Sequence, residues 1–280
     1  MNPYIQSLRL RTLPLSMSGI ILGSGLAGFL NYWTFAWAIC TTLSLQILSN
    51  LSNELGDALK GTDSDQNERV AYGLQAGTIT QTQMKGMICL FAGLSVVFGT
   101  ILIYSAFGSL WKLQSLGFLG LGLLAIIGAI TYTLGKHNYG YKGFGDLGVF
   151  VFFGLGSTLG SYYLQTQTMS WDVVMSGVAI GLPCVGVLNL NNVRDMDNDL
   201  AHGKRTFASL LGQRGGRMYQ TILLVACLAI FADNGHYWTL CILPIWAWHL
   251  WYVWTHEEGL DKQMPVLMFS TLIVAILAII

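Results

Sequence analysis

Two acidic stretches, each following a long apolar segment, carry most of the side chains in this sequence that could take part in chemistry. They cover residues 53–65 and 191–205. In the second stretch Asp195 and Asp199 are spaced i, i+4, so at a helical end they would face the same way, with Cβ atoms about 6 Å apart. Two carboxylates that close repel each other unless a cation lies between them, which makes the pair a candidate metal site.

The first stretch repeats this pattern. Asn53 and Asp57 have the same spacing, and Asp63 lies beyond Gly61 on a predicted turn. All of these candidate ligands are oxygen atoms, and oxygen-only sets with carboxylates suit Mg²⁺ or Mn²⁺. Mg²⁺ is typically held by one or two carboxylates together with substrate phosphates. The pattern therefore predicts a magnesium site that also binds a phosphorylated substrate.

Basic residues accompany both stretches and could bind phosphate oxygens or a substrate carboxylate. They include Lys60, Arg194, Lys204 and Arg205. The alternative is that both stretches are ordinary solvated loops. Two stretches at equivalent helix ends disfavour that alternative, because acids at the mouth of a membrane bundle are costly and are kept where they hold a cation or a substrate.

The composition indicates a membrane protein. Of the 280 residues, 53% are apolar and 10% are charged, and the mean hydropathy is +0.55. A soluble domain has about 25% charged residues, so lipid must cover most of this surface. The formal net charge is zero, which gives no long-range attraction to nucleic acid.

Nine apolar segments are long enough to cross a bilayer as helices, so we expect an all-α polytopic membrane protein. The predicted spans are 13–31, 34–52, 85–107, 115–135, 147–165, 172–190, 218–233, 237–254 and 264–280. With the N-terminus in the cytoplasm, thirteen of the fourteen Lys and Arg residues fall on the inner side and only Lys112 on the outer side. By the positive-inside rule, both acidic stretches then face the cytoplasm.

This placement predicts an internal repeat. The second and sixth spans are four helices apart and both end in Asn-rich, Asp-rich sequence, with Asp57 and Asp195 138 positions apart. Two four-helix halves and a ninth helix, in a single domain over residues 1–280, would bring both acidic ends to the mouth of one central cavity.

The loop between the fourth and fifth spans adds further polar side chains. Tyr132 and Lys136 are spaced to share one helix face, and Lys142 and Asp146 follow them. Positive-inside anchoring alone would explain the two lysines. Their place on the same side as the acids makes a role at phosphate equally consistent with the pattern.

These motifs carry a resemblance. The paired patterns Asn53-x-x-x-Asp57 and Asp195-x-x-x-Asp199 resemble the two aspartate-rich motifs of the UbiA superfamily of intramembrane aromatic prenyltransferases, and Tyr132-x-x-x-Lys136 resembles its third motif. The stretches 11–14, 61–63, 139–146 and 188–195 are similar to the branch of 1,4-dihydroxy-2-naphthoate polyprenyltransferases of menaquinone synthesis. The chain departs from the family in having Asn53-Glu54 where Asn-Asp is usual.

The resemblance implies a polyprenyl diphosphate and 1,4-dihydroxy-2-naphthoate as substrates, with demethylmenaquinol, diphosphate and CO₂ as products, in a bacterial inner membrane. It implies Mg²⁺ as cofactor. The metal ligands it implies are Asn53, Asp57, Asp63, Asp195 and Asp199. The catalytic residues it implies are Asp57, Asp195, Asp199, Lys136 and Tyr132. The substrate-binding residues it implies are Asn53, Lys60, Lys142, Asp146, Asn191, Asn192, Arg194, Lys204 and Arg205.

Two alternatives remain open from sequence. One is a prenyltransferase for another acceptor, such as 4-hydroxybenzoate or a haem. The other is a cation-coupled transporter, whose inverted repeats with acids in the bilayer midplane would have a similar composition. The acids here lie at one face, the four-helix offset gives parallel repeats, and no span interior carries a charge, all of which disfavour transport.

Overall fold

The structure is a computed structural model that describes residues 2–61, 73–136 and 138–280. Its regular elements in these ranges are helices, as the sequence predicts. The α-helices are α1 (Pro3–Ser7), α2 (Leu13–Leu26), α3 (Tyr32–Lys60), α4 (Gln81–Phe107), α5 (Leu113–Thr131), α6 (Gly145–Val149), α7 (Ser157–Thr166), α8 (Trp171–Arg194), α9 (Met196–Ala201), α10 (Phe207–Asp233), α11 (Leu243–Thr255) and α12 (Gln263–Leu277). Shorter turns are η1 (Leu10–Thr12), η2 (Tyr139–Tyr141), η4 (Tyr237–Ile242) and η5 (Leu260–Lys262), and η3 (Phe150–Gly156) is a π-helical stretch between α6 and α7.

Each of the nine predicted spans falls on a helix or a helical run. Six of the described helical runs are long and apolar enough to cross a membrane. The other three are α2, which has 14 residues, α3, whose second half is polar, and the run of η4 with α11. The seventh span is longer than predicted, because α10 begins at Phe207. The chain is therefore a multi-pass membrane protein.

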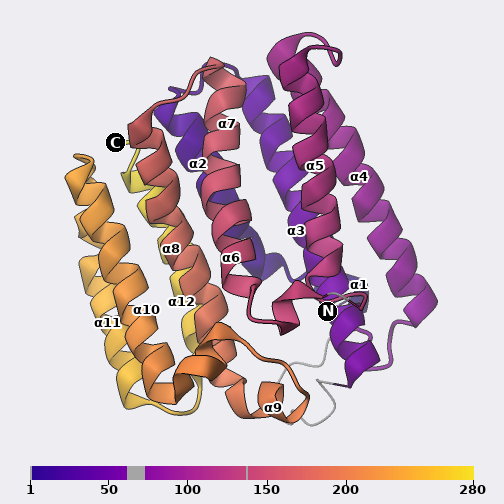
Figure 1. Cartoon of the computed structure of the whole chain (residues 1–280), viewed down its shortest axis with the longest axis vertical. Helices are drawn as coiled ribbons and strands as arrows, with labels where there is room; N and C mark the ends of the chain where they lie inside the picture. Colours follow the sequence, from indigo (N-terminus) through magenta and orange to yellow (C-terminus); the bar gives the residue numbers. More distant parts are fainter. Residues whose placement is uncertain (1, 62–72, 137) are drawn as a thin grey trace.

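The helices run alternately up and down, so that the last turns of α3, α5 and α8 and the first turns of α4, α6 and α10 meet at one end of the bundle (Figure 1). The packing follows the predicted four-helix offset. α3 packs on α4 as α8 packs on α10, and α12 packs on both α2 and α8. This arrangement confirms the prediction that Asp57 and Asp195 lie at the same end of the bundle, whereas residues 62–65 of the first stretch lie outside the described residues.

Local sequence sets where α3 begins and ends. The side chain of Asn31 accepts hydrogen bonds from the backbone N–H groups of Trp33 and Thr34, which satisfies two donors of the first turn. The helix ends at Gly61, whose φ of 70° is left-handed and suits glycine. Asp57 therefore lies in the last turn of the helix, beside the loop that follows.

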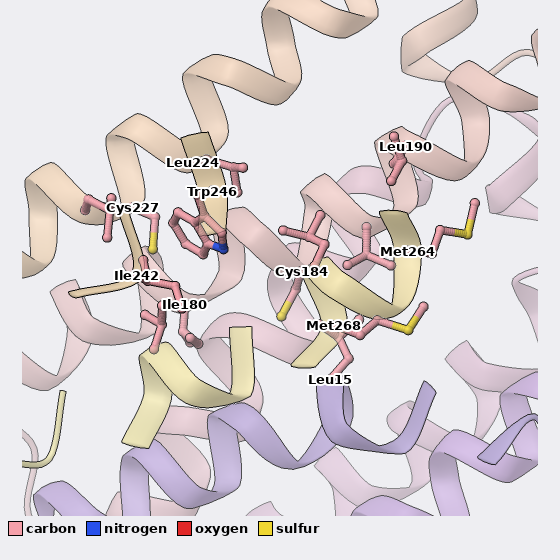
Figure 2. Packing of buried hydrophobic residues seen from close by; sticks show 14 of the residues in the cluster. Leu15, Ile180, Cys184, Leu190, Leu224, Cys227, Ile242, Trp246, Met264 and Met268 are labelled. Carbon is pink, nitrogen blue, oxygen red and sulfur yellow. The ribbon is translucent and has the colours of Figure 1, made fainter. Parts of the chain in front are cut away.

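The largest buried cluster is formed mainly by helices of the second half of the chain, α8, α10, α11 and α12. From the first half, α2 packs against them. Figure 2 shows Cys184 of α8 and Met268 of α12 within this cluster, next to Leu15 of α2. α8 is central: 72% of its apolar window is buried, compared with 6% for α5, which leaves α5 to face lipid. The apolar core around α8 therefore fixes the position of its acidic end.

Small residues allow η3 to approach α8 closely. A Cβ atom on Gly154 would lie 2.6 Å from the Cα of Gly181, so neither position has room for a larger side chain without movement. Where no hydrophobic force drives helices together in lipid, such contacts hold them by dispersion. The contact fixes the fifth span, and with it the loop before α6, against α8.

Candidate active site

The candidate site lies where the last turns of α3 and α8 meet the loop from Tyr132 to Gly145 and the segment from His202 to Thr206 (Figure 1). At the end of α3, Asp57 accepts a hydrogen bond of 2.7 Å from the hydroxyl of Tyr141. Asn53, one turn earlier, accepts one from the hydroxyl of Thr133 through its Oδ1. Both polar groups of α3 are thus held by the loop after α5.

Lys60 strengthens the same connection. Its Nζ donates to the carbonyl oxygen of Thr133 at 2.8 Å and lies 3.5 Å from the centre of the Tyr141 ring. A cation over the face of a tyrosine ring is attracted by the negative charge of that face. These contacts hold the loop after α5 against the end of α3.

The end of α8 is organised by cations. Arg194 donates from Nε and Nη2 to the two carboxylate oxygens of Asp195, at 2.7 and 2.8 Å, and from Nη2 to Oδ1 of Asn191 at 2.8 Å. Lys204 pairs with Asp199 at 3.0 Å. Asp195 and Asp199 are both buried, and the backbone N–H of Asp199 donates to the carbonyl of Asp195 at 2.8 Å.

Tyr141 connects the two acidic ends. Its hydroxyl contacts Asp57, its carbonyl accepts a 3.1 Å hydrogen bond from the backbone N–H of Arg205, and Lys204 Nζ lies 5.6 Å from its ring centre. The neighbouring Lys142 forms a parallel backbone bridge with Arg205. The structure therefore brings Lys60, Asp57, Lys204 and Arg205 around Tyr141, which the sequence analysis did not assign to the site.

The ring of Tyr132 packs edge-to-face on the ring of Tyr139, with the ring centres 5.2 Å apart. Burial raises the pKa of Tyr132 above the usual range, and the fields of Tyr139, Asp146, Asp57 and Asp199 raise it further. Burial likewise raises the pKa of Tyr139 to about 12. Tyr132 is therefore a neutral hydroxyl at physiological pH, suited to donating a hydrogen bond and unsuited to acting as a base.

Two further predicted residues lie in the same region with oxygen atoms available. Asp146, in the first turn of α6, accepts a hydrogen bond from Tyr219 of α10, and its Oδ2 is buried without a hydrogen-bond partner. The Oδ1 of Asn192 is likewise buried without a partner among the described residues. Unpaired buried acceptors are costly, and these two oxygens are available to a metal ion or to a donor group of a substrate.

Glu54 differs from its neighbours. Its side chain is fully buried, and its Oε1 accepts hydrogen bonds from the hydroxyl of Ser7 at 3.1 Å and from the backbone N–H of Leu74 at 2.8 Å. It therefore ties α1 and the segment before α4 to α3. This contact gives the unusual glutamate a structural task beside Asn53.

One prediction about helix geometry is wrong. α5 ends at Thr131, and Gly135 has a φ of 87°, so Tyr132 and Lys136 do not share a helix face. Lys136 is exposed and makes no hydrogen bond with the described part of the chain. The predicted ligand Asp63 lies outside the described residues. Within those residues, no three His, Cys, Asp or Glu side chains are grouped closely enough to hold a metal ion by themselves.

Sequence reasoning missed Tyr141, Thr133 and Tyr219, which supply hydroxyl donors to Asp57, Asn53 and Asp146. Tyr141 had a signal, because it lies in the stretch 139–146 that carries the family resemblance. Thr133 and Tyr219 had none, since each reaches the site through tertiary packing.

The UbiA prenyltransferase family matches residues 12–273, which is most of the chain. The chain belongs to this family of enzymes.

Two bacterial relatives are similar to this chain over most of its length. The chain is 40% identical, over 88% of its length and 79% of the relative's, to the 1,4-dihydroxy-2-naphthoate octaprenyltransferase of Escherichia coli strain K12. It is 36% identical to the Haemophilus influenzae protein of the same name, over 96% of this chain and 90% of that one.

Solved structures agree with the fold. A UbiA homologue from Aeropyrum pernix K1 superposes with a TM-score of 0.71 at 15% identity, over 95% of this chain and 96% of that one. A homologue from Archaeoglobus fulgidus, bound to GPP and Mg²⁺, superposes with a TM-score of 0.62 at 13% identity, over 99% of both chains. At these identities the likeness concerns the fold alone.

Proposed function

We propose that this protein transfers a polyprenyl group from a polyprenyl diphosphate to 1,4-dihydroxy-2-naphthoate, in menaquinone biosynthesis. Diphosphate and CO₂ leave, and demethylmenaquinol is formed. The observation that carries the proposal is the meeting of two oxygen-rich helix ends, with Lys60, Lys204 and Tyr141 between them. The names of the two bacterial relatives, at 40% and 36% identity over most of the chain, support the choice of acceptor.

The donor set fits Mg²⁺. Asn53, Asp57, Asp195 and Asp199 offer oxygen atoms only, and Asn192 adds a buried oxygen without a partner. These residues, with Asp63 as a further predicted ligand, would hold the ion together with the diphosphate. When bound, Mg²⁺ supplies positive charge that stabilises the leaving diphosphate.

The residues of the chain would prepare both substrates. Arg194 and Lys204 now pair with carboxylates and would share their donors with phosphate oxygens, joined by Lys60 and Arg205. Lys136 and Lys142 are exposed at the rim and remain predicted phosphate contacts. Tyr132 would donate a hydrogen bond as a neutral hydroxyl.

In the reaction, the prenyl C–O bond breaks and its electron pair leaves with the diphosphate. The electron-rich ring carbon that bears the carboxylate attacks the allylic carbon, and the bond to CO₂ breaks, which returns its electron pair to the ring. The bundle would protect the cationic carbon from water. Each buried CH₂ of the tail is worth about 0.8 kcal/mol, which explains why such chemistry takes place in a membrane.

We further propose that residues 1–280 act as one domain in a bacterial inner membrane, with the N-terminus and the acidic mouth in the cytoplasm. The alternation of the helices places Lys112, which immediately precedes α5, at the opposite end from the acids, in line with the positive-inside rule.

The test uses the purified protein in lipid nanodiscs with one radiolabelled polyprenyl diphosphate. 1,4-Dihydroxy-2-naphthoate, 4-hydroxybenzoate and a haem are supplied in separate reactions, with Mg²⁺ or with EDTA. We expect labelled demethylmenaquinol from the naphthoate alone, and no product with EDTA. Product from another acceptor would move the protein to a different branch, and the absence of Mg²⁺-dependent transfer to any acceptor would refute the proposal.

A further inference from the structure

Four buried polar side chains form a continuous chain through the second half of the bundle. They are Asn189 of α8, Gln220 of α10, His249 of α11 and Gln263 of α12. None is more than 1% exposed. Polar groups in the interior of a membrane protein are costly and rare, so a row of four requires an explanation.

The hydrogen bonds run in one direction. Asn189 Nδ2 donates to Gln220 Oε1 at 2.9 Å, Gln220 Nε2 lies 3.3 Å from His249 Nε2, and His249 Nδ1 lies 3.0 Å from Gln263 Oε1. Because the amide of Gln220 donates to the ring, Nε2 must be the acceptor, and the proton must lie on Nδ1. The imidazole of His249 is therefore neutral and held in one tautomer.

Both ends of this row reach the acidic end of α8. Asn189 lies two residues before Asn191, and its Nδ2 also donates to the carbonyl of Gly216 at 2.9 Å. Gln263 begins α12 and precedes Met264, whose sulfur lies 3.6 Å from Nη1 of Arg194.

Arg194 links Met264 to the acidic motif, because its other N–H groups donate hydrogen bonds to Asp195 and Asn191. The row thus connects α10, α11 and α12 to Asn191, near the end of α8, and to Asp195, which follows the helix.

From this geometry we infer that His249 is a positioning residue for the second acidic motif. It holds α12 and α10 at fixed distances from α8, so that Arg194 and Asp195 are in place before a ligand arrives. The inference deepens the proposed function and rests on it for the identity of the ligand. Side chains that orient metal ligands from behind commonly change metal affinity by about 10- to 100-fold when they are replaced.

A second buried hydrogen bond between α11 and α12, outside the row, provides the control. Trp246 of α11 donates from Nε1 to Ser270 of α12 at 2.8 Å, and both are buried. Figure 2 shows Trp246 within the apolar cluster near Leu224 and Cys227. Replacing Ser270 with alanine removes a buried hydrogen bond between α11 and α12 without touching the path to Arg194.

The experiment compares wild type, His249→Leu, His249→Gln and Ser270→Ala in nanodiscs. The first readout is the gain in Tm produced by Mg²⁺ with an uncleavable prenyl diphosphate analogue, as a function of Mg²⁺ concentration. The second is the Mg²⁺ concentration that gives half-maximal prenyl transfer. We expect His249→Leu to raise both midpoints about 10-fold. We expect His249→Gln, whose amide can accept and donate, to restore them to within about threefold.

Ser270→Ala should lower the Tm of the free protein and leave both Mg²⁺ midpoints unchanged. Folded His249→Leu with wild-type midpoints, or an equal shift in Ser270→Ala, would overturn the inference. If His249→Leu does not fold, Met264→Ala takes its place, since it removes the contact to Arg194. An unchanged Mg²⁺ midpoint in Met264→Ala would then refute the positioning role.

A separate measurement does not depend on activity. In wild type with ¹⁵N-labelled histidine, the ring nitrogens of His249 should show a proton on Nδ1 and none on Nε2 at pH 7. The opposite tautomer or a charged ring would contradict the hydrogen-bond row. A wild type that binds Mg²⁺ with the analogue but transfers no prenyl group would refute the proposed function and leave this inference standing.

Discussion

The two acidic helix ends hold their carboxylates in different ways. At the end of α3, Asp57 accepts a hydrogen bond from the neutral hydroxyl of Tyr141. At the end of α8, Asp195 accepts hydrogen bonds from Nε and Nη2 of the Arg194 guanidinium. Asp199 forms an ion pair with Lys204. The two ends are related by the repeat, and yet they differ in the chemistry of their partners.

This difference predicts how each end should respond when a charged side chain is removed. At the first end a phenol orients the carboxylate and the nearby cation, Lys60, is exposed, so this end should depend most on the charge of its acid for attracting a metal ion. A guanidinium balances the charge of a buried acid, so the second end should depend on its cation for stability as well. Substitutions at the two ends should therefore separate activity from stability.

The largest effects on activity are expected when either acidic end loses a carboxylate charge. Asp57→Asn keeps the size of the side chain and removes its charge, and it should lower Mg²⁺-dependent prenyl transfer by about 10³-fold or more while the Tm changes little. Asp199→Asn should lose as much activity and some stability, because it leaves Lys204 without its partner. Product formation and thermal unfolding in nanodiscs measure both. Full activity in both variants would remove the basis of the proposed metal site.

The next effect concerns stability at the second end. Arg194→Leu leaves Asp195, which is 7% exposed, without its counter-charge. Breaking a fully buried pair costs about 3–5 kcal/mol, and the partial exposure of Arg194 should reduce this to roughly 2–3 kcal/mol. Denaturation monitored by tryptophan fluorescence would report it. Arg194→Lys keeps the charge and loses the two-armed contact, so its Tm should be intermediate. An unchanged Tm in Arg194→Leu would contradict the comparison.

A smaller effect should follow from the hydroxyl of Tyr141, the residue that connects the two ends. Tyr141→Phe removes one hydrogen bond to a carboxylate, worth about 1.5–3 kcal/mol, and should reduce kcat/KM by roughly 10- to 100-fold. The matched control is Tyr139→Phe, because that hydroxyl donates to the carbonyl of Gly128 at 3.1 Å, away from the acids. Equal losses in the two variants would show that Tyr141 acts through folding alone.

The smallest effect is expected from Lys60, which is exposed and lies over the Tyr141 ring. At an exposed site this contact is worth about 0.5–1 kcal/mol, so Lys60→Met should raise KM for the prenyl diphosphate by less than about tenfold. The increase should shrink as salt is added, because salt screens exposed charges. A salt-independent change would indicate that Lys60 acts through its hydrogen bond to Thr133 instead.

Much of this arrangement could be predicted from the chain. Apolar segments of membrane length located the helices, and the distribution of Lys and Arg placed Asp57 and Asp195 at the same end. The spacing of Asp195 and Asp199 predicts that their side chains face the same way, which stays a prediction, and a backbone hydrogen bond between the two residues spans the break after α8. Local periodicity and membrane thickness determine these features, and both can be read from a sequence.

The remaining features depend on tertiary contacts. The end of α5 was missed because apolar residues continue past Thr131, whereas Gly135 turns the chain away. The part played by Tyr141 depends on the loop that carries it crossing between two distant helix ends. The task of Glu54 depends on α1 and Leu74 meeting above α3. No pattern within a single segment contains this information.

The positions of the two chain ends have a topological consequence. Figure 1 shows the N-terminus near the acidic end of the bundle and the C-terminus at the other end. Whichever way the bundle is inserted, a tag attached after Ile280 will be in a different compartment from one attached before α1. A pair of compartment-specific reporters on the same molecule would therefore read its orientation, and each would serve as the control for the other.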